Sequence, residues 1–343
     1  MNWRNMVMNP VLDKEFRLRM RSPRSAITIL AYVLVMGLFA MGIIYVLTST
    51  GMTSSRVDSG TSRLMFYALS IAQLVLIAFM TPALTAGVIS GEREKQTLNM
   101  LLTTQQSSSA IILSKLVSSL SFMTLIIEAT LPVYSIVFLY GGVSTGQLLL
   151  VFLFDLFVML LLGAIGVCFS TLFKKTIFAV IMTYGAGLVI FLFTGIAYLF
   201  AMSIDQANYY SSGAASLRAY SWVGYILGLN PAGALISIFE PSFSESAFFV
   251  QRSNLQSSAP IALWQEFLLV YSVVIVIMLW IAIRKIRPVR GRRRGKAGQA
   301  VLAVQDVQAA SGGLHEDSAE LPPPPEGLKQ MEKVEPKARE REK

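Results

Sequence analysis

Apolar residues dominate this chain in long, nearly uninterrupted runs that short polar segments separate. Each run reaches about 20 residues or more, the length that a helix rising about 1.5 Å per residue needs to cross ~30 Å of hydrocarbon. In hydrocarbon the backbone amides must be satisfied within their own segment, and the short alternating strands of a barrel are absent from the sequence. The pattern therefore predicts an all-α, polytopic membrane protein.

The apolar runs predict six transmembrane helices. They cover roughly residues 26–48, 64–90, 111–139, 147–173, 177–202 and 261–283. The second and third runs exceed the minimum length, so we expect these helices to tilt, kink or project into water. Pro82 and Pro132 lie inside them and are the predicted kink sites.

The distribution of basic residues tests this count, because Lys and Arg accumulate in short cytoplasmic segments. With six spans, nineteen basic residues fall on one side of the membrane and four on the other. The richer side holds both chain ends and the loops after the second and fourth spans. We therefore predict that both termini are cytoplasmic. The net charge of +9 then reflects topology and attraction to membrane lipid, and it needs no nucleic-acid partner.

Composition divides the chain into three parts. Residues 1–25 are predicted to be a cytoplasmic amphipathic interfacial segment, and residues 26–284 the six-helix transmembrane domain with an extracytoplasmic segment at 203–260. The remainder, 285–343, begins strongly basic and continues as a polar, Pro-containing tail that is predicted to be cytoplasmic and disordered, because it cannot bury enough apolar surface. A mean hydropathy of +0.59 agrees with a membrane protein.

The loop after the second span, "GEREKQTLNMLLTT", stands out because it places four consecutive charges, residues 92–95, between two apolar runs. Leu98, Leu101 and Leu102 follow with i, i+3, i+4 spacing, so a short helix here would carry one apolar stripe. Such a stripe fits the membrane interface or a groove on another protein. Both readings are compatible with the residues alone.

This loop resembles the signature of type-2 ABC transporter permeases. The matching positions are Glu92, Arg93, Glu94, Thr97, Leu98, Leu101, Leu102, Thr104, Ile111 or Ile112, and Lys115. The departures are Gln96 for a glycine, Asn99 for an acid, Gln105 for a proline and Ser114 for a glycine. The N-terminal "NPVLDKEFRLRMRSPRS" and the outer "LNPAGALISIF", a candidate short helix, are also similar to segments of the family, and the resemblance covers roughly residues 9–290.

The resemblance implies a type-2 ABC exporter fold in which loop 91–110 contains a cytoplasmic coupling helix. The implied contacts with a separate ATPase subunit are Glu92, Arg93, Glu94, Thr97, Leu98, Leu101, Leu102 and Thr104. An N-terminal interfacial helix carrying Lys14, Glu15, Arg17, Arg19 and Arg21 would pack beside it or hold anionic headgroups.

The family also implies a composition for the complex. The chain would be the permease subunit of an ABC transporter, expected to be an exporter, and would form half of the translocation pathway with a second copy or a related permease. Two ABC ATPase subunits would supply ATP and magnesium; the sequence itself has no G-x-x-x-x-G-K-[ST] phosphate loop, so no cofactor is expected to bind it directly. The expected location is a bacterial plasma membrane.

Two carboxylates lie within the predicted spans, Glu128 and Asp155, at nearly the same depth. A charge at that depth costs at least about 2.5 kcal/mol, so each is expected to be protonated or to face water or protein. One interpretation is a substrate or proton contact on the pathway; the other is a hydrogen bond that joins neighbouring helices.

Other functional classes find less support in the residues. The only histidine, His315, lies in the tail, so neither a His-based metal site nor a Ser/His catalytic pair can form in the membrane, and no catalytic or metal-binding residues are predicted. A membrane scaffold or receptor that recruits a soluble cytoplasmic partner remains the alternative to a transporter. The sequence does not distinguish among substrates.

Overall fold

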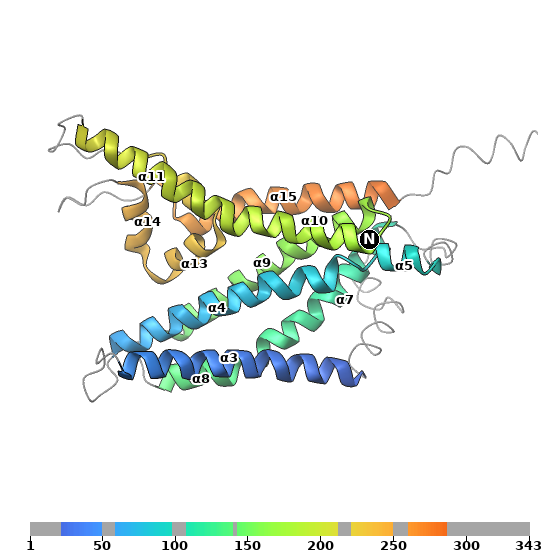
Figure 1. The fold of residues 1–343 in the computed structure, drawn as a ribbon, viewed down its shortest axis with the longest axis horizontal. Coiled ribbons are helices and arrows are strands. Elements are labelled where there is room, and N and C mark those ends of the chain that lie inside the picture. Colours follow the sequence, from blue (N-terminus) through green and yellow to red (C-terminus); the bar gives the residue numbers. More distant parts are fainter. Residues whose placement is uncertain are drawn as a thin grey trace, which may run out of the picture. The chain divides into compact units, whose positions relative to one another are not determined.

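The elements of the described residues are helices (Figure 1). The computed structural model describes residues 22–49, 59–97, 108–139, 143–211, 221–249 and 260–286. The helices are α3 (Pro23–Ser49), α4 (Ser59–Thr85), α5 (Ser90–Glu94), α7 (Ser108–Glu128), α8 (Leu131–Leu139), α9 (Thr145–Leu172), α10 (Thr176–Leu188), the π-helix η1 (Val189–Phe193), α11 (Thr194–Ser211), α12 (Gly224–Gly228), α13 (Pro231–Phe239), α14 (Pro241–Phe248) and α15 (Leu263–Ile286). They belong to one unit, Met1–Arg287, and the second unit, Pro288–Lys343, lies outside the described residues.

Six helical segments are long and apolar enough to cross a membrane, which confirms the predicted count. They are Ser25–Leu47, Gly60–Glu94, Ser108–Phe138, Thr145–Leu172, Thr176–Asn208 and Leu263–Ile286. Most of the predicted interfacial segment, residues 1–21, and nearly all of the predicted tail, residues 287–343, lie outside the described residues. The proposals of an interfacial helix and of a disordered tail therefore stay predictions.

Both predicted kink sites coincide with interruptions. Pro82 lies inside α4, which ends three residues later at Thr85 and continues through a turn into α5. The third span is divided between α7 and α8, and Pro132 is the second residue of α8. Proline lacks the amide that a helix interior requires, so the ladder of backbone hydrogen bonds breaks beside it.

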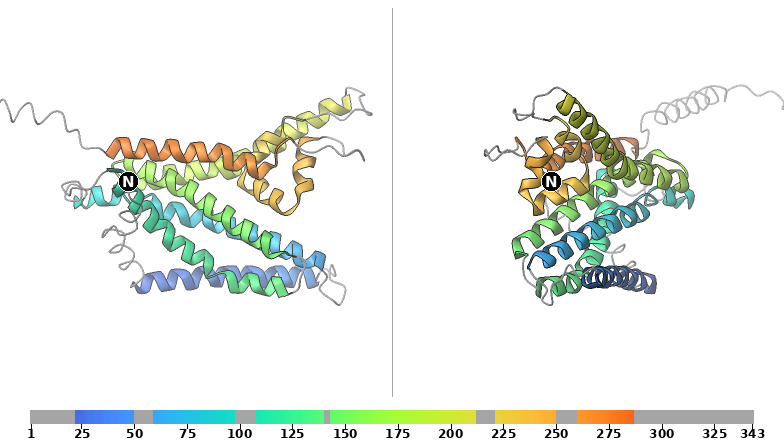
Figure 2. Two further views of the ribbon diagram at one scale, coloured as in Figure 1. Left: turned by 180° about the vertical axis from the view of Figure 1, so that it is seen from behind. Right: turned by 60° about the vertical axis from the view of Figure 1, so that its left-hand side comes forward.

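Helix α9 packs in the interior of the bundle, against α15, α4, α10 and α7 (Figures 1 and 2). Its glycines allow this close packing. A Cβ atom at Gly166 would lie 2.2 Å from Thr85 Oγ1 of α4, and one at Gly163 would lie 2.9 Å from Leu120 Cδ2 of α7. Small residues at these positions therefore bring three spans together by van der Waals contact, as membrane helices require.

The segment between the fifth and sixth spans folds into three short helices, α12, α13 and α14. Figures 1 and 2 show them at the opposite end of the spans from α5, as the predicted topology requires. Helix α13 occupies the predicted "LNPAGALISIF" stretch. Phe239 stacks on Tyr67 of α4 with ring centroids 4.4 Å apart, so this end of the bundle is tied to the second span.

The fifth span contains a π-helical turn, η1, between α10 and α11. The Asn230 side chain donates hydrogen bonds to the Phe191 carbonyl (2.7 Å) and to Thr194 Oγ1 (3.0 Å). Its Oδ1 accepts from the amides of Ala232 and Gly233 and so caps α13. The Asn230 side chain therefore satisfies a carbonyl of the π-turn and also caps α13. These contacts join the outer segment to the fifth span.

Candidate functional site

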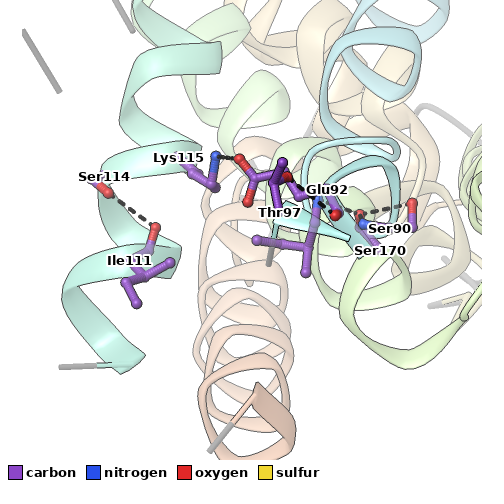
Figure 3. A network of polar contacts seen from close by, with 8 residues as sticks. Ser90, Glu92, Thr97, Ile111, Ser114, Lys115 and Ser170 are labelled. Atoms are coloured by element: carbon purple, nitrogen blue, oxygen red, sulfur yellow. Dashed lines mark hydrogen bonds and ion pairs between the residues drawn. The ribbon is translucent and has the colours of Figure 1, made fainter. Parts of the chain in front are cut away.

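Helix α5 continues the second span beyond a turn, and its N-terminus is capped by another span. Ile89, the residue before α5, provides no side-chain cap. Instead Ser170 Oγ of α9 accepts hydrogen bonds from the amides of Ile89 and Ser90, both at 2.9 Å (Figure 3). The first amides of a helix have no partner within the helix, so this serine stabilises the start of α5 from a distance of 80 residues along the chain.

Glu92 of α5 forms an ion pair with Lys115 of α7 (Figure 3). The Lys115 side chain is 4% exposed and the Glu92 side chain 25% exposed. A buried ammonium group requires a counter-charge, because its desolvation is expensive. The pair therefore fixes the first turn of α5 against the beginning of the third span.

Arg93 extends to the end of α9. Its guanidinium donates to the carbonyls of Phe173 (3.0 Å) and Thr171 (3.2 Å). The last carbonyls of a helix have no partner within the helix and carry partial negative charge. Arg93 satisfies two of these acceptors and binds α5 to the fourth span.

Glu94 caps the N-terminus of α10, the helix that follows α9. One carboxylate oxygen accepts from the Thr176 amide at 2.7 Å, and the other accepts from Thr176 Oγ1 at 3.0 Å. Lys175, the residue before α10, provides no side-chain cap of its own. A negative group at a helix N-terminus is favourable, so Glu94 joins α5 to the fifth span.

The charged segment Glu92, Arg93 and Glu94 therefore binds three other parts of the same chain. Thr97, which was predicted beside it, donates to the Glu92 carbonyl at 3.2 Å. The other predicted ATPase contacts, Leu98, Leu101, Leu102 and Thr104, lie outside the described residues, as do Lys14, Glu15, Arg17, Arg19 and Arg21. Contact of any of these residues with an ATPase stays a prediction. Sequence reasoning missed the partners Lys115, Thr176 and Ser170.

Gln96 has a backbone φ of 58°, in the left-handed region. It follows Lys95, the C-cap of α5, and its amide donates to the Arg93 carbonyl at 3.1 Å. Glycine is favoured at such a helix end, because a side chain crowds the left-handed conformation. This is the position at which the permease signature has glycine, so the backbone keeps the shape that the signature residue favours.

The two intramembrane acids have different surroundings. Asp155 is fully buried in α9 and lies 2.7 Å from the Gln73 amide group of α4. Glu128, the last residue of α7, is exposed. Although Asp155 and Glu128 lie at a similar depth along their spans, their environments differ. A role for either residue on a translocation pathway stays a prediction. Among the described residues, no three His, Cys, Asp or Glu side chains gather to hold a metal ion.

An apolar groove of about 140 Å³ lies between the second and fifth spans. Its lining consists of Val75, Ala78, Phe79, Tyr184, Gly187, Leu188 and Phe191. The Tyr184 hydroxyl donates to the Phe79 carbonyl at 2.7 Å, which satisfies the polar groups at this surface. The two helices that form the groove, α4 and α10, are also joined to α5 at their other ends.

Comparison with known families places these features in one class of protein. The family model described as ABC-2 family transporter protein matches residues 9–285. None of the curated proteins matches the sequence. The chain therefore belongs to the ABC-2 transporter family, and with its six apolar helices it is a membrane subunit of an ABC transporter. This confirms the family that the loop signature indicated and the all-α fold class that the apolar runs predicted.

Proposed function

We propose that this chain is the permease of an ABC exporter and is driven by a separate ATPase that binds loop 91–110. The observation that supports this most strongly is the set of contacts made by α5. Through Glu92, Arg93 and Glu94, one short helix is attached to the third, fourth and fifth spans, and it directly continues the second. A force applied to the loop would therefore reach four spans at once.

The energy for such a movement comes from ATP binding to the partner. Closure of two ATPases would favour one permease conformation over another, because the attached ATPases would bind ATP with different affinities in the two conformations of the complex. Leu98, Leu101 and Leu102 are the proposed docking stripe, and Thr97 and Thr104 flank it. ATP and magnesium bind the ATPase and not this chain. The charged segment would transmit the movement to the other spans, in addition to its predicted contact with the ATPase.

The groove between α4 and α10 is the proposed half of the translocation pathway. It is apolar and open, with Phe79 61% and Leu188 59% exposed. Its two walls belong to spans that α5 joins at their other ends, so movement of the loop would change the groove. A second permease, identical or related, faces it in the proposed complex. Both termini are cytoplasmic, and the membrane is a bacterial plasma membrane.

Copurification and transport measurements with the full chain test this proposal. Leu101→Asp combined with Leu102→Asp should release the ATPase and abolish ATP-dependent transport. Lys115→Met leaves the loop sequence intact but removes its tie to the third span, so it should keep the ATPase bound while transport falls at least severalfold. Glu245→Gln is the matched control, because Glu245 is an exposed acid of α14 at the other end of the spans.

Two results would overturn the proposal. If the ATPase stays bound to the double aspartate variant and is stimulated normally, the leucine stripe is not the docking site. A partner that copurifies but never drives ATP-dependent movement of any cargo would support the alternative, a membrane scaffold that recruits a soluble protein.

A further inference from the structure

Three polar side chains form a fully buried chain between the second span and its neighbours. Gln73 of α4 lies between Asp155 of α9 and Thr130, which is in the break between α7 and α8. All three are 0% exposed. The Gln73 amide is 2.7 Å from Asp155 Oδ2 at one end and 3.0 Å from Thr130 Oγ1 at the other. Thr130 Oγ1 also lies 2.6 Å from the Ile127 carbonyl.

Counting hydrogens identifies the donor in each contact. The Thr130 hydroxyl has one hydrogen but lies next to two acceptors, Gln73 Oε1 and the Ile127 carbonyl, when the Gln73 nitrogen faces Asp155. The shorter contact, to the Ile127 carbonyl, takes the hydrogen. Two oxygen atoms then face each other at 3.0 Å with no hydrogen between them. A buried chain with such a gap is unfavourable.

Turning the Gln73 amide by half a turn removes the conflict. The nitrogen then donates to Thr130 Oγ1 and the oxygen faces Asp155, with all heavy atoms in the same places, because the two ends of an amide have nearly the same shape. The distances fit this arrangement: 3.0 Å is typical of N–H···O and 2.7 Å of O–H···O. The remaining contact requires Asp155 to donate, and only a protonated carboxyl group has a hydrogen to donate.

The other side of the carboxyl group supports a neutral acid independently. Asp155 Oδ1 is buried and makes no hydrogen bond with any described residue. An ionised carboxylate would need several donors or a cation there. Among the described residues, the ionisable groups that interact with Asp155 are the hydroxyls of Tyr32 from α3 and Tyr134 from α8. Tyr134 also lies beside Ser70, whose own hydroxyl donates to the Phe66 carbonyl.

The other ionisable side chains on the helices that pack against α9 have other neighbours or are exposed. Lys115 pairs with Glu92, Tyr67 donates to Glu240, Tyr184 to the Phe79 carbonyl and Tyr271 to the Leu229 carbonyl, Arg284 lies over Trp280, and Arg63, Glu128 and Lys285 are exposed. Two further groups face other parts of the bundle: Glu266 lies against Gly228 of α12, and Cys168 of α9 packs with Ile89 and Ile112 beside α5. Helix α13, which also packs on α9, has no ionisable side chain. No described cation is therefore placed to neutralise Asp155.

We propose that Asp155 is a proton-binding site of the transmembrane domain, in which the bound proton is donated to Gln73 and completes the chain Asp155–Gln73–Thr130–Ile127. The proton joins α9 to α4, the span that leads into α5. Its release would leave two acceptors, Asp155 Oδ2 and Gln73 Oε1, facing each other until the amide turned back. This polar contact between the second and fourth spans therefore depends on one proton, which goes beyond the transporter function proposed above.

Infrared spectroscopy of the full chain in lipid tests for this proton. A protonated carboxyl group has a C=O stretching band apart from the amide and carboxylate bands. At neutral pH, Asp155→Asn should remove one such band, and Glu128→Gln should leave that band in place. Thr130→Val, which removes the acceptor for Gln73, should shift the band, whereas Thr130→Ser should preserve it. Retention of every protonated-carboxyl band in Asp155→Asn would overturn the proposal.

Stability as a function of pH gives a second test with a definite sign. A proton held by the folded state and not by the unfolded state stabilises the protein less as pH rises. The melting temperature of the wild type, relative to Asp155→Asn, should therefore fall with increasing pH. A rise would indicate an ionised carboxylate and refute the proposal. If Asp155→Asn does not fold, Gln73→Leu serves instead: it should shift the wild-type band, and an unshifted band would count against the site.

Discussion

The ion pair between Glu92 and Lys115 makes an asymmetric prediction, because its two members are buried to different extents. Lys115 is 4% exposed and Glu92 is 25% exposed. Glu92→Ala leaves a buried ammonium group without its counter-charge. Lys115→Met replaces that group with an apolar chain of similar length and leaves a carboxylate on a side chain that is 25% exposed. The glutamate substitution should therefore be the more damaging of the two.

The magnitudes follow from the exposure of each partner. Removing one member of a fully buried pair costs about 3–5 kcal/mol. Water can enter where the partly exposed Glu92 side chain was removed, so we expect about 2–3 kcal/mol for Glu92→Ala and about 1 kcal/mol for Lys115→Met. The double variant has no unpaired charge, so its loss should be smaller than the sum of the two single losses.

The single cysteine provides the assay. Cys168 is a free, buried thiol of α9, and it packs with Ile89 and Ile112 at this end of the bundle. Its reaction with a maleimide requires local opening, so the labelling rate reports the free energy of that opening. Glu92→Ala should raise the rate roughly 30- to 150-fold and Lys115→Met roughly fivefold. Glu245→Ala, at the exposed outer end, is the control without effect.

Two results would refute this reasoning. One is a labelling rate in Lys115→Met as high as in Glu92→Ala, which would mean that the buried charge does not determine the cost. The other is a double variant whose rate equals the product of the single effects, which would mean that the two side chains act independently.

Three further substitutions have expected outcomes that thermal unfolding in lipid can measure. Gln96→Gly should stabilise the protein by about 0.5 kcal/mol, because φ is 58° there, whereas Gln96→Ala should give no gain. Gly166→Ala should destabilise by about 1–3 kcal/mol, because its Cβ would lie 2.2 Å from Thr85 Oγ1, and Thr85→Ala should restore part of the loss. Asn230→Ala should cost about 2 kcal/mol, because the π-turn and the α13 cap both lose their partner. Asn230→Ser keeps an oxygen for the cap but cannot donate to the Phe191 carbonyl, so the stability of this variant should lie between those of the wild type and Asn230→Ala.

Hydropathy and proline positions predicted the spans well, because length and apolarity are local properties of the sequence. The six spans, the break beside Pro132 and helix α13 all follow from residues close together in the chain. The orientation of each span about its own axis does not, because helices that are apolar all round give no periodic signal. For that reason Glu128 and Asp155 looked alike in the sequence, yet one is exposed and the other fully buried.

The contacts of the charged segment show a second limit of sequence reasoning. Charges at a loop are normally expected to face solvent or a partner. Glu92 instead pairs with a lysine 23 residues away, and Arg93 and Glu94 bind backbone groups about 80 residues away. Backbone carbonyls leave no mark in a sequence, so no residue pattern could have identified the partners of Arg93. The family signature located the important segment but did not reveal what its charges bind inside the chain.

The serine that caps α5 has a consequence for biogenesis. A chain enters the membrane from its N-terminus, and Ser170 is synthesised 80 residues after Ser90. The helix after the second crossing thus remains without its cap until the fourth crossing is in place, and Phe173 and Thr176 follow later still. If loop 91–110 binds the ATPase as proposed, an unfinished protein would lack an ordered attachment site, and recruitment would wait until the fourth and fifth spans have been inserted.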